Sequence, residues 1–289
     1  MPSMWKSRLR GNLWEGDKSS QDGVREMTTD RDILFERGRR NLSRIGRIIT
    51  IAAGKGGVGK SVVAASLALT LGERGKNVGL LDLDVHGPSI PDILHARGEI
   101  VASKEGLKPL SVHGIKVMST GMLIGDNPLP TKGEDKRNII SFLVGLTNWG
   151  NLDYLIIDLP PGTGDETIWV LRALRGLKNV GVLVVTTPSI LAVSVVRRLL
   201  SMLEDEKIRV IGIVENMAYF NCEGKVYRPF GRFSEELVRR FKLRVIASLP
   251  IDPSLEQTIY DGGLPHRSSE ELKSAFYRLC EVVESSWGE

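Results

Sequence analysis

Residues 46–75 read GRIITIAAGKGGVGKSVVAASLALTLGERG, and this segment predicts three structural elements in a row. Its first part, 46–54, is a run of apolar and β-branched residues that ends in glycine, which predicts a buried strand. Its last part, 60–75, has apolar residues at helical spacing and a glycine stop, which predicts a helix. Between them lies a glycine-rich loop that fits G-x4-G-K-[ST]. A strand, such a loop and a helix in this order predict a phosphate-binding turn.

The rest of the chain repeats the alternation of strand and helix. Apolar runs predict further strands, and helical spacing predicts helices between them, at 77–84, 114–120, 134–149, 153–162, 181–187, 190–203, 208–217, 243–250 and 269–285. This alternation is typical of an α/β fold with a mostly parallel sheet covered by helices on both faces. We expect one such P-loop domain over residues 46–289. A charged extension over residues 1–45, partly disordered or helical, is expected to precede it.

The charge distribution bears on partners and location. Residues 1–47 hold 11 Lys/Arg and 7 Asp/Glu, which equals the net charge of +4, so the main body is neutral. A neutral body argues against a nucleic-acid face, although the basic arm leaves such a contact open. The acidic end, 270–289, argues against membrane docking by a basic amphipathic helix. The sequence shows no signal peptide, no uninterrupted apolar span and only two cysteines, so we expect a cytoplasmic protein.

The glycine-rich loop carries the groups that bind a nucleotide. Its glycines let backbone N–H groups converge on phosphate oxygens, and the helix that follows adds the positive end of its dipole. Lys60 is predicted to reach the β- and γ-phosphates, and the Ser61 hydroxyl is predicted to bind Mg²⁺. The predicted nucleotide-binding residues of the loop are Gly54, Lys55, Gly56, Gly57, Val58, Gly59, Lys60 and Ser61.

Carboxylates at two other predicted strand ends complete the expected site. In LIIDLPPGTGDE (155–166), Asp158 follows three apolar residues and is predicted to bind Mg²⁺, while the Gly162 amide is predicted to face the γ-phosphate. In LLDLDVHGPS (80–89), Asp82 and Asp84 are two further carboxylates at a predicted strand end. We expect Asp84, the outer one, to orient the attacking water.

Four motifs together resemble one known family. GKGGVGKS, LLDLDVHGPSIP, LDYLIIDLPPGTGD and IVENMAYFNC lie in family order within residues 46–265. They resemble the Mrp/ApbC branch of the MinD/ParA-like P-loop ATPases with a deviant Walker A motif. The resemblance implies a slow, Mg-dependent ATPase that works as a homodimer with ATP sandwiched at the interface. It also implies that Lys55 crosses to the nucleotide of the partner subunit, and that Asn216 hydrogen-bonds adenine.

The resemblance further implies an iron–sulfur cluster carrier, and here the sequence departs from the family pattern. The family carries C-x-x-C shortly after the ENM segment, so that a dimer offers four thiolates to one cluster. This chain has Cys222 at the first position but Lys225 at the second, so a dimer would offer two. Cys222 therefore stays open between a residual cluster ligand and a plain loop thiol. Cys280 has apolar neighbours at helical spacing and is predicted to lie in the core.

Three functions compete at this stage. The leading hypothesis is an Mrp-like ATPase that serves iron–sulfur client apoproteins. The first alternative is a MinD/ParA-like ATPase switch that organises other molecules in space. The second is a nucleotide-gated regulatory protein with negligible turnover, which carries no cluster. The same loop residues serve all three, so turnover and cluster binding are the properties that separate them.

Overall fold

The computed structural model describes residues 30–124, 133–232 and 234–287 of the 289-residue chain. Its main sheet has the strand order β10-β9-β8-β1-β7-β2-β6-β5, with β11 also paired to β9. The neighbouring pairs among β8, β1, β7, β2 and β6 are all parallel, as are β9 with β8 and with β11. The strands are β1 (Arg47–Ala52), β2 (Val78–Asp82), β5 (Leu110–Val112), β6 (Ile115–Ser119), β7 (Tyr154–Asp158), β8 (Val180–Thr186), β9 (Val210–Cys222), β10 (Lys225–Tyr227) and β11 (Val245–Pro250).

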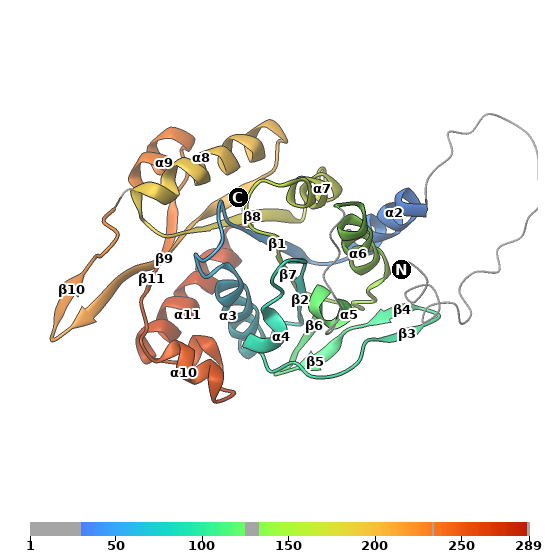
Figure 1. Ribbon diagram of the computed structural model, residues 1–289, viewed down its shortest axis with the longest axis horizontal. Helices are drawn as coiled ribbons and strands as arrows, with labels where there is room; N and C mark the ends of the chain where they lie inside the picture. Colours follow the sequence, from blue (N-terminus) through green and yellow to red (C-terminus); the bar gives the residue numbers. More distant parts are fainter. Residues whose placement is uncertain (1–29, 125–132, 233, 288–289) are drawn as a thin grey trace, which may run out of the picture.

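Helices cover both faces of this sheet (Figure 1). One layer holds α3 (Lys60–Glu73), α4 (Ile90–Ile93), α10 (Leu255–Tyr260), the short 3-10 helix η1 (Pro265–Arg267) and α11 (Glu270–Ser285). The other holds α2 (Asp30–Leu42), α6 (Gly133–Leu146), α7 (Asp165–Leu174), α8 (Ile190–Asp205) and α9 (Ser234–Phe241). The short helix α5 (Thr120–Ile124) and a separate hairpin of β3 (Val101–Ser103) and β4 (Gly106–Lys108) complete the described elements. The predicted fold class is confirmed.

Alternation along the central strands explains why there are two layers. In β1, Ile48 packs into the core beneath α6, α7 and α8, whereas Ile49 packs into the core beneath α3 and α11. β7 alternates in the same way, with Leu155 in the first core and Ile156 in the second. Both faces are apolar, so the sheet needs helices on both sides to keep these residues from water. Cys280 lies fully buried in the second core, as predicted.

Part of the predicted N-terminal extension packs onto the domain. Helix α2 lies against α6 with close backbone contact, because a Cβ on Gly145 would come within 2.6 Å of the Leu34 carbonyl oxygen. Arg39 of α2 donates hydrogen bonds to the carbonyl oxygens of Ala173 and Arg175, both at 3.0 Å. The remainder of that extension, residues 1–29, lies outside the described residues. No helix among the residues that the structure describes is long and apolar enough to cross a bilayer.

Strand β9 is longer than the sequence predicted. The predicted strand ended at residue 217, but β9 runs on to Cys222 and turns back as β10 through Glu223 and Gly224. Both turn residues have left-handed φ angles, 49° and 76°, as two-residue hairpin turns of the primed types require. The exposed hairpin projects beyond the body of the sheet (Figure 1). The prediction was short because the polar residues Glu215 and Asn216 interrupt the apolar run of this strand.

An ion-pair cluster ties the end of α3 to the C-terminal helices. Glu73 accepts hydrogen bonds from His266 Nε2 at 2.9 Å, Arg267 Nε at 2.8 Å and the Tyr277 hydroxyl at 3.1 Å. A carboxylate only accepts, so Nε2 carries the proton and Nδ1 is the bare nitrogen. His266 Nδ1 is buried without a hydrogen-bond partner among the described residues. Burial lowers the pKa of His266, and the Glu73 carboxylate opposes that shift only in part.

We expect this cluster to make the unliganded protein less stable in mild acid. Because the pKa of His266 is lowered in the fold, the unfolded chain takes up a proton first as the pH falls through about 6.5. His266 therefore contributes a falling Tm between pH 7.5 and about 5.5, whereas Asp82, whose pKa is raised by burial to about 7, contributes a rising Tm over the same range. As the pH falls, His266→Gln should lose less Tm, or gain more, than wild type, whereas Tyr277→Phe, which removes a different contact of Glu73, should follow the wild-type slope. Equal slopes in wild type and His266→Gln would contradict this account.

Candidate nucleotide-binding site

The glycine-rich loop lies between the end of β1 and the start of α3, as predicted. Gly57 and Gly59 have φ angles of 75° and 78°, in the left-handed region that L-residues with a side chain adopt at a cost. A Cβ at Gly59 would also lie 2.2 Å from Asn216 Nδ2, so the Asn216 side chain would have to move. The loop conformation thus depends on glycine, which leaves its backbone N–H groups free to face an anion at the N-terminus of α3.

Three predicted site residues from two distant segments meet at this loop. Lys60 Nζ lies 2.5 Å from Asp158 Oδ1, and the Ser61 hydroxyl donates to Asp158 Oδ2 at 2.6 Å. β1 and β7 are neighbours in the sheet, so the end of β7 brings Asp158 beside the first turn of α3. A hydroxyl and a carboxylate are the hard oxygen ligands that Mg²⁺ prefers. The residues present therefore fit a magnesium ion.

Two buried carboxylates lie at adjacent strand ends near the loop, and their negative charges repel each other. Asp82 and Asp158 lie directly opposite each other in the register of β2 and β7, and both are fully buried. Burial, and then the nearby Asp158 carboxylate, raise the pKa of Asp82 to about 7. Burial also raises the pKa of Asp158, while the Lys60 ammonium pulls it back down. A cation added here would relieve the repulsion between the two carboxylates.

Asp82 and Asp84 differ in which oxygens are already engaged. Asp82 Oδ1 accepts the Asp84 N–H at 3.0 Å and its Oδ2 accepts the Ser119 hydroxyl at 2.8 Å. Asp84 Oδ1 accepts the N–H groups of His86 and Gly87, at 3.0 and 3.1 Å. Asp84 Oδ2 has no hydrogen-bond partner in the part of the chain that the structure describes. Of the two, Asp84 retains an oxygen that can bind another molecule.

Gly162 and Asn216 already have partners within the chain. The Gly162 N–H donates to the Ala53 carbonyl at 2.8 Å, so contact with a phosphate requires this bond to be exchanged. Asn216 Nδ2 donates to the Val58 carbonyl at 2.9 Å and therefore braces the phosphate-binding loop. The hydrogen bond between Asn216 and Val58 was not anticipated from the sequence. No local pattern indicates it, because 158 residues separate the two partners. Adenine binding by Asn216 stays a prediction.

Lys55 stands apart from the other loop residues. Its side chain is exposed, as are Gly56 and Gly57, whereas Val58 and Lys60 are buried. Within residues 30–124, 133–232 and 234–287 it has no hydrogen bond or ion pair. Lys55 is therefore accessible to a ligand or to another molecule, and its contact with the nucleotide of a partner subunit stays a prediction.

Cys222 lies at the tip of the β9–β10 hairpin, directly opposite Lys225 in the antiparallel register. Cys222 is exposed, and so is Lys225. The two positions at which the resemblance implies cysteines thus face each other across a two-residue turn, and only Cys222 carries a thiol. No three His, Cys, Asp or Glu side chains gather into a metal-binding group in the described part of one chain.

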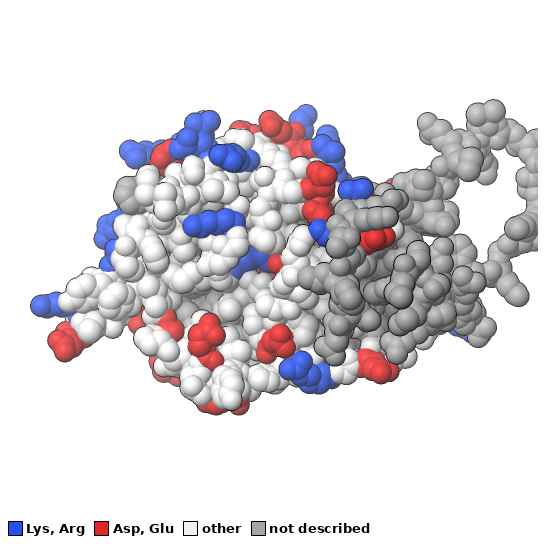
Figure 2. All heavy atoms as spheres, viewed as in Figure 1, with Lys and Arg blue, Asp and Glu red and all other residues white. Residues whose placement is uncertain are grey.

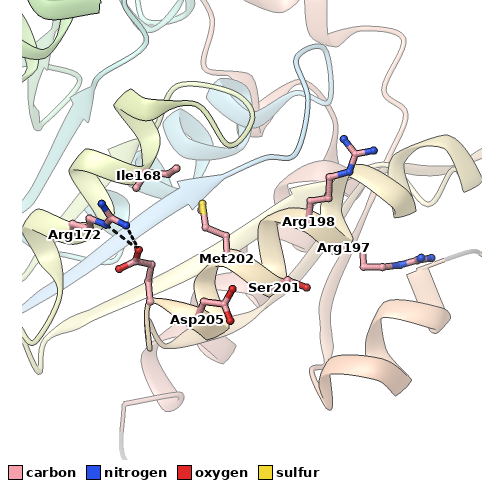
Figure 3. Close-up of a pocket in the computed structure, with 8 residues that line it drawn as sticks. Ile168, Arg172, Arg197, Arg198, Ser201, Met202 and Asp205 are labelled. Carbon is pink, nitrogen blue, oxygen red and sulfur yellow. Dashed lines mark hydrogen bonds and ion pairs between the residues drawn. The ribbon is translucent and has the colours of Figure 1, made fainter.

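A groove of about 460 Å³ between α7 and α8 lies outside the phosphate site (Figure 3). Ile168 and Met202 are apolar side chains on its two walls, and Arg172 binds Glu206 through two nitrogens at 2.9 and 2.7 Å. Lys and Arg side chains also gather along the outer edge over α8 and α9 (Figure 2). No predicted nucleotide-binding residue lines the groove. The groove is therefore separate from the predicted nucleotide site at the glycine-rich loop.

The fold and the loop geometry together define a P-loop NTPase. The family model of ParA-type NUBPL iron-transfer P-loop NTPases matches residues 44–284. A protein of Aquifex aeolicus named iron-sulfur cluster carrier protein is 38% identical over 256 residues, which cover 85% of this chain and 69% of that protein. The Rattus norvegicus cytosolic Fe-S cluster assembly factor NUBP2 is 40% identical over 233 residues, or 77% of this chain and 85% of that protein. The chain thus belongs to the NUBPL iron-transfer family of P-loop NTPases, which confirms the resemblance.

Solved structures agree with this assignment. The nucleotide-binding protein of Archaeoglobus fulgidus in complex with ADP is 39% identical, with a TM-score of 0.71 over 84% of this chain and 96% of that chain. The cell division ATPase MinD of Pyrococcus furiosus is 22% identical, with a TM-score of 0.62 over 83% of this chain and 99% of that one, and shows the shared fold alone. An iron-transfer family and an ADP-bound relative favour the carrier hypothesis over the spatial-organiser alternative.

Proposed function

We propose that this chain binds and hydrolyses ATP as a cytoplasmic homodimer and carries iron–sulfur clusters to client apoproteins. The observation that carries the proposal is the convergence of Lys60, Ser61 and Asp158 on the phosphate-binding loop, with Lys55 exposed beside them. The cluster carrier of Aquifex aeolicus and the cytosolic assembly factor of Rattus norvegicus support the cargo and the compartment by their similarity.

Nucleotide binding exchanges partners that the loop residues already have. Lys60 leaves Asp158 for the β- and γ-phosphates, where its positive charge offsets theirs. Ser61 and Asp158 would hold Mg²⁺, which would supply positive charge near the phosphate oxygens. Because Asp158 is buried and its pKa is raised by burial, losing the Lys60 ammonium without a replacement cation would be costly. The movement of the Lys60 side chain from Asp158 to the phosphates is therefore coupled to the binding of Mg²⁺.

Hydrolysis is assigned to a water molecule oriented by Asp84. The water oxygen bonds to the γ-phosphorus, the bond from that phosphorus to the β–γ bridging oxygen breaks, and the proton of the water ends on inorganic phosphate. Asp84 supports this step through Oδ2, which has no other partner among the described residues, while the N–H groups of His86 and Gly87 fix Oδ1. Asp82 is unsuited to the same task because both of its oxygens are engaged.

The second subunit completes the site in this proposal. Lys55 delivers its ammonium group to the phosphates of the partner subunit, where a cation in trans stabilises the negative charge of the transition state. Hydrolysis then requires two copies of the chain. The exposure of Lys55 and its lack of a partner within the described residues support this assignment.

Cargo binding is assigned to the tip of the β9–β10 hairpin. Two copies of the chain offer two Cys222 thiolates, whereas a [4Fe–4S] cluster takes four. Lysine is a poor substitute for a thiolate as an iron ligand, so we propose that the remaining thiols come from small-molecule thiols or from the client. A cluster held in this way would be labile, which suits transfer.

The turnover of the Asp84→Asn variant tests the enzymatic part of the proposal. We expect phosphate release with Mg-ATP to fall about 10²- to 10³-fold, because an amide keeps the shape of the carboxylate but holds the water less strongly. ATP affinity should stay within a few-fold of wild type. Asp92→Asn is the matched control, since the Asp92 side chain is 75% exposed and, among the described residues, forms an ion pair only with Arg97.

Two results would contradict the proposal in different ways. Equal and near-zero rates in wild type and Asp84→Asn would favour the nucleotide-gated regulatory protein without turnover. A normal rate in Asp84→Asn beside an active wild type would mean that another group positions the water.

A further inference from the structure

The turn that carries Asp84 is closed by its own hydrogen bonds. Asp84 Oδ1 accepts the N–H groups of His86 and Gly87, at 3.0 and 3.1 Å, so the carboxylate is tied to the backbone of the turn. The Thr120 hydroxyl donates to the Asp84 carbonyl oxygen at 2.7 Å and fixes the beginning of the turn. A displacement of His86 is therefore transmitted to the Asp84 carboxylate.

The His86 side chain joins this turn to a different element of the fold. Its Nε2 lies 3.2 Å from Nζ of Lys136, in the first turn of α6. An ammonium group only donates, so Lys136 is the donor, Nε2 is the acceptor, and the neutral ring carries its proton on Nδ1. This hydrogen bond connects α6 to the turn that holds the Asp84 carboxylate, across 50 residues of sequence.

The position of Lys136 is unfavourable for α6 taken alone. A cation in the first turn of a helix faces the positive end of the helix dipole. The Lys136 side chain is also half-buried, so its long stem loses conformational freedom. Stability of α6 does not account for a lysine at this position, whereas the hydrogen bond to His86 gives it a function.

Helix α6 is a firm support for this hydrogen bond. It lies beside α2 (Figure 1), and the two helices approach closely at a glycine on each. A Cβ on Gly38 of α2 would come within 3.0 Å of the Val144 carbonyl oxygen, and Gly145 of α6 is just as close to the backbone of α2. Such backbone packing leaves α6 little room to shift. Lys136 thus projects from a fixed element toward the Asp84 turn.

We propose that Lys136 and His86 are positioning residues for ATP hydrolysis, which hold the turn from Asp84 to Gly87 at the place where the Asp84 carboxylate orients the attacking water. The inference rests on the function proposed above for Asp84 and adds the residues that keep it in place. Without this hydrogen bond, the turn keeps its internal bonds but can move relative to the phosphate-binding loop. A small displacement of a catalytic group lowers the rate of the chemical step more than it lowers substrate binding.

Steady-state ATP hydrolysis in a double-mutant cycle tests the inference. Lys136→Met keeps the length of the stem but removes the donor, and His86→Leu removes the acceptor. Each should lower kcat about 10-fold while KM for Mg-ATP stays within about two-fold of wild type. The double variant should lose no more than either single variant, because both remove one hydrogen bond.

Two further variants separate positioning from a general effect of the substitutions. Lys136→Arg retains a donor and should keep most of the wild-type kcat. Lys108→Met is the matched control, since Lys108 is exposed on β4 of the separate β3–β4 hairpin, and its kcat should equal that of wild type. A kcat lowered equally by Lys108→Met would overturn the inference, since it would show a general effect of losing a surface charge.

The remaining outcomes distinguish this inference from the proposed function. An unchanged kcat in Lys136→Met, beside an active wild type and an impaired Asp84→Asn, would overturn the inference and leave the proposed function standing. Additive losses in the double variant would also overturn it, because the two side chains would then act separately. A wild type without turnover, or a normal rate in Asp84→Asn, would overturn the function assigned to Asp84 and this inference with it.

Discussion

Lys55→Ala is expected to lower ATP hydrolysis about 10³-fold while ATP binding stays close to that of wild type. Lys55 is exposed and has no partner within the described chain, so its removal leaves the fold and its own phosphate site intact. Lys60→Ala should instead lose both binding and hydrolysis, because Lys60 belongs to the buried group around Asp158. Phosphate release and calorimetric binding on the same preparations measure both effects. Full activity in Lys55→Ala would remove the basis for its assigned function.

Mixing two inactive variants tests whether Lys55 acts in trans. In a mixed dimer of Lys55→Ala and Asp84→Asn, the Lys55→Ala subunit keeps its own Asp84 and receives Lys55 from its partner. Equal amounts should recover roughly a quarter of wild-type activity, since half the dimers are mixed and each has one complete site. If Lys55 acted within its own subunit, no mixed dimer would contain a complete site. Mixing would then recover nothing.

Lys225→Cys is expected to convert a weak cluster site into a stable one. Residues 222 and 225 face each other across the hairpin turn, so the change places a second thiol beside Cys222 on each chain. A dimer would then offer four thiolates, the number that one [4Fe–4S] cluster takes. After anaerobic reconstitution with iron and sulfide followed by gel filtration, Lys225→Cys should retain about four irons per dimer. Wild type should lose most of its iron, and Cys222→Ser should retain none.

A matched control distinguishes cluster ligation from a general effect of an added thiol. Val226→Cys adds a cysteine one residue away, at another exposed position of β10. In a strand, neighbouring side chains point to opposite faces, so this thiol would not face Cys222. Val226→Cys should therefore behave like wild type. If Val226→Cys retained as much iron as Lys225→Cys, the position of residue 225 opposite Cys222 would not explain the retained iron. A wild type that held four irons stably would show that ligands other than the two Cys222 thiols exist.

Much of the site follows from local sequence alone. The conformation of the loop from Gly54 to Ser61 depends on glycines with left-handed φ angles and on the helix that follows. The pattern of these eight consecutive residues predicts both features. The two-layered fold is equally readable, because central strands buried on both faces appear as uninterrupted apolar runs. Asp158 follows such a run, and its position beside Lys60 was foreseeable from the rule that parallel strands bring their carboxyl ends together.

Other features were decided by contacts between distant segments. The sequence shows two carboxylates at 82 and 84, but only the fold buries Asp82 between Ser119 and the Asp84 amide and leaves one oxygen of Asp84 without a partner among the described residues. Asn216 braces the loop from a strand 158 residues away. Likewise, the uncharged run 179–196 is compatible with complete burial, and the exposure of Leu191 emerges only when α8 packs on Gly54. Local pattern specifies backbone geometry and which faces are apolar, whereas exposure and free hydrogen-bonding capacity depend on which neighbours the packed elements bring.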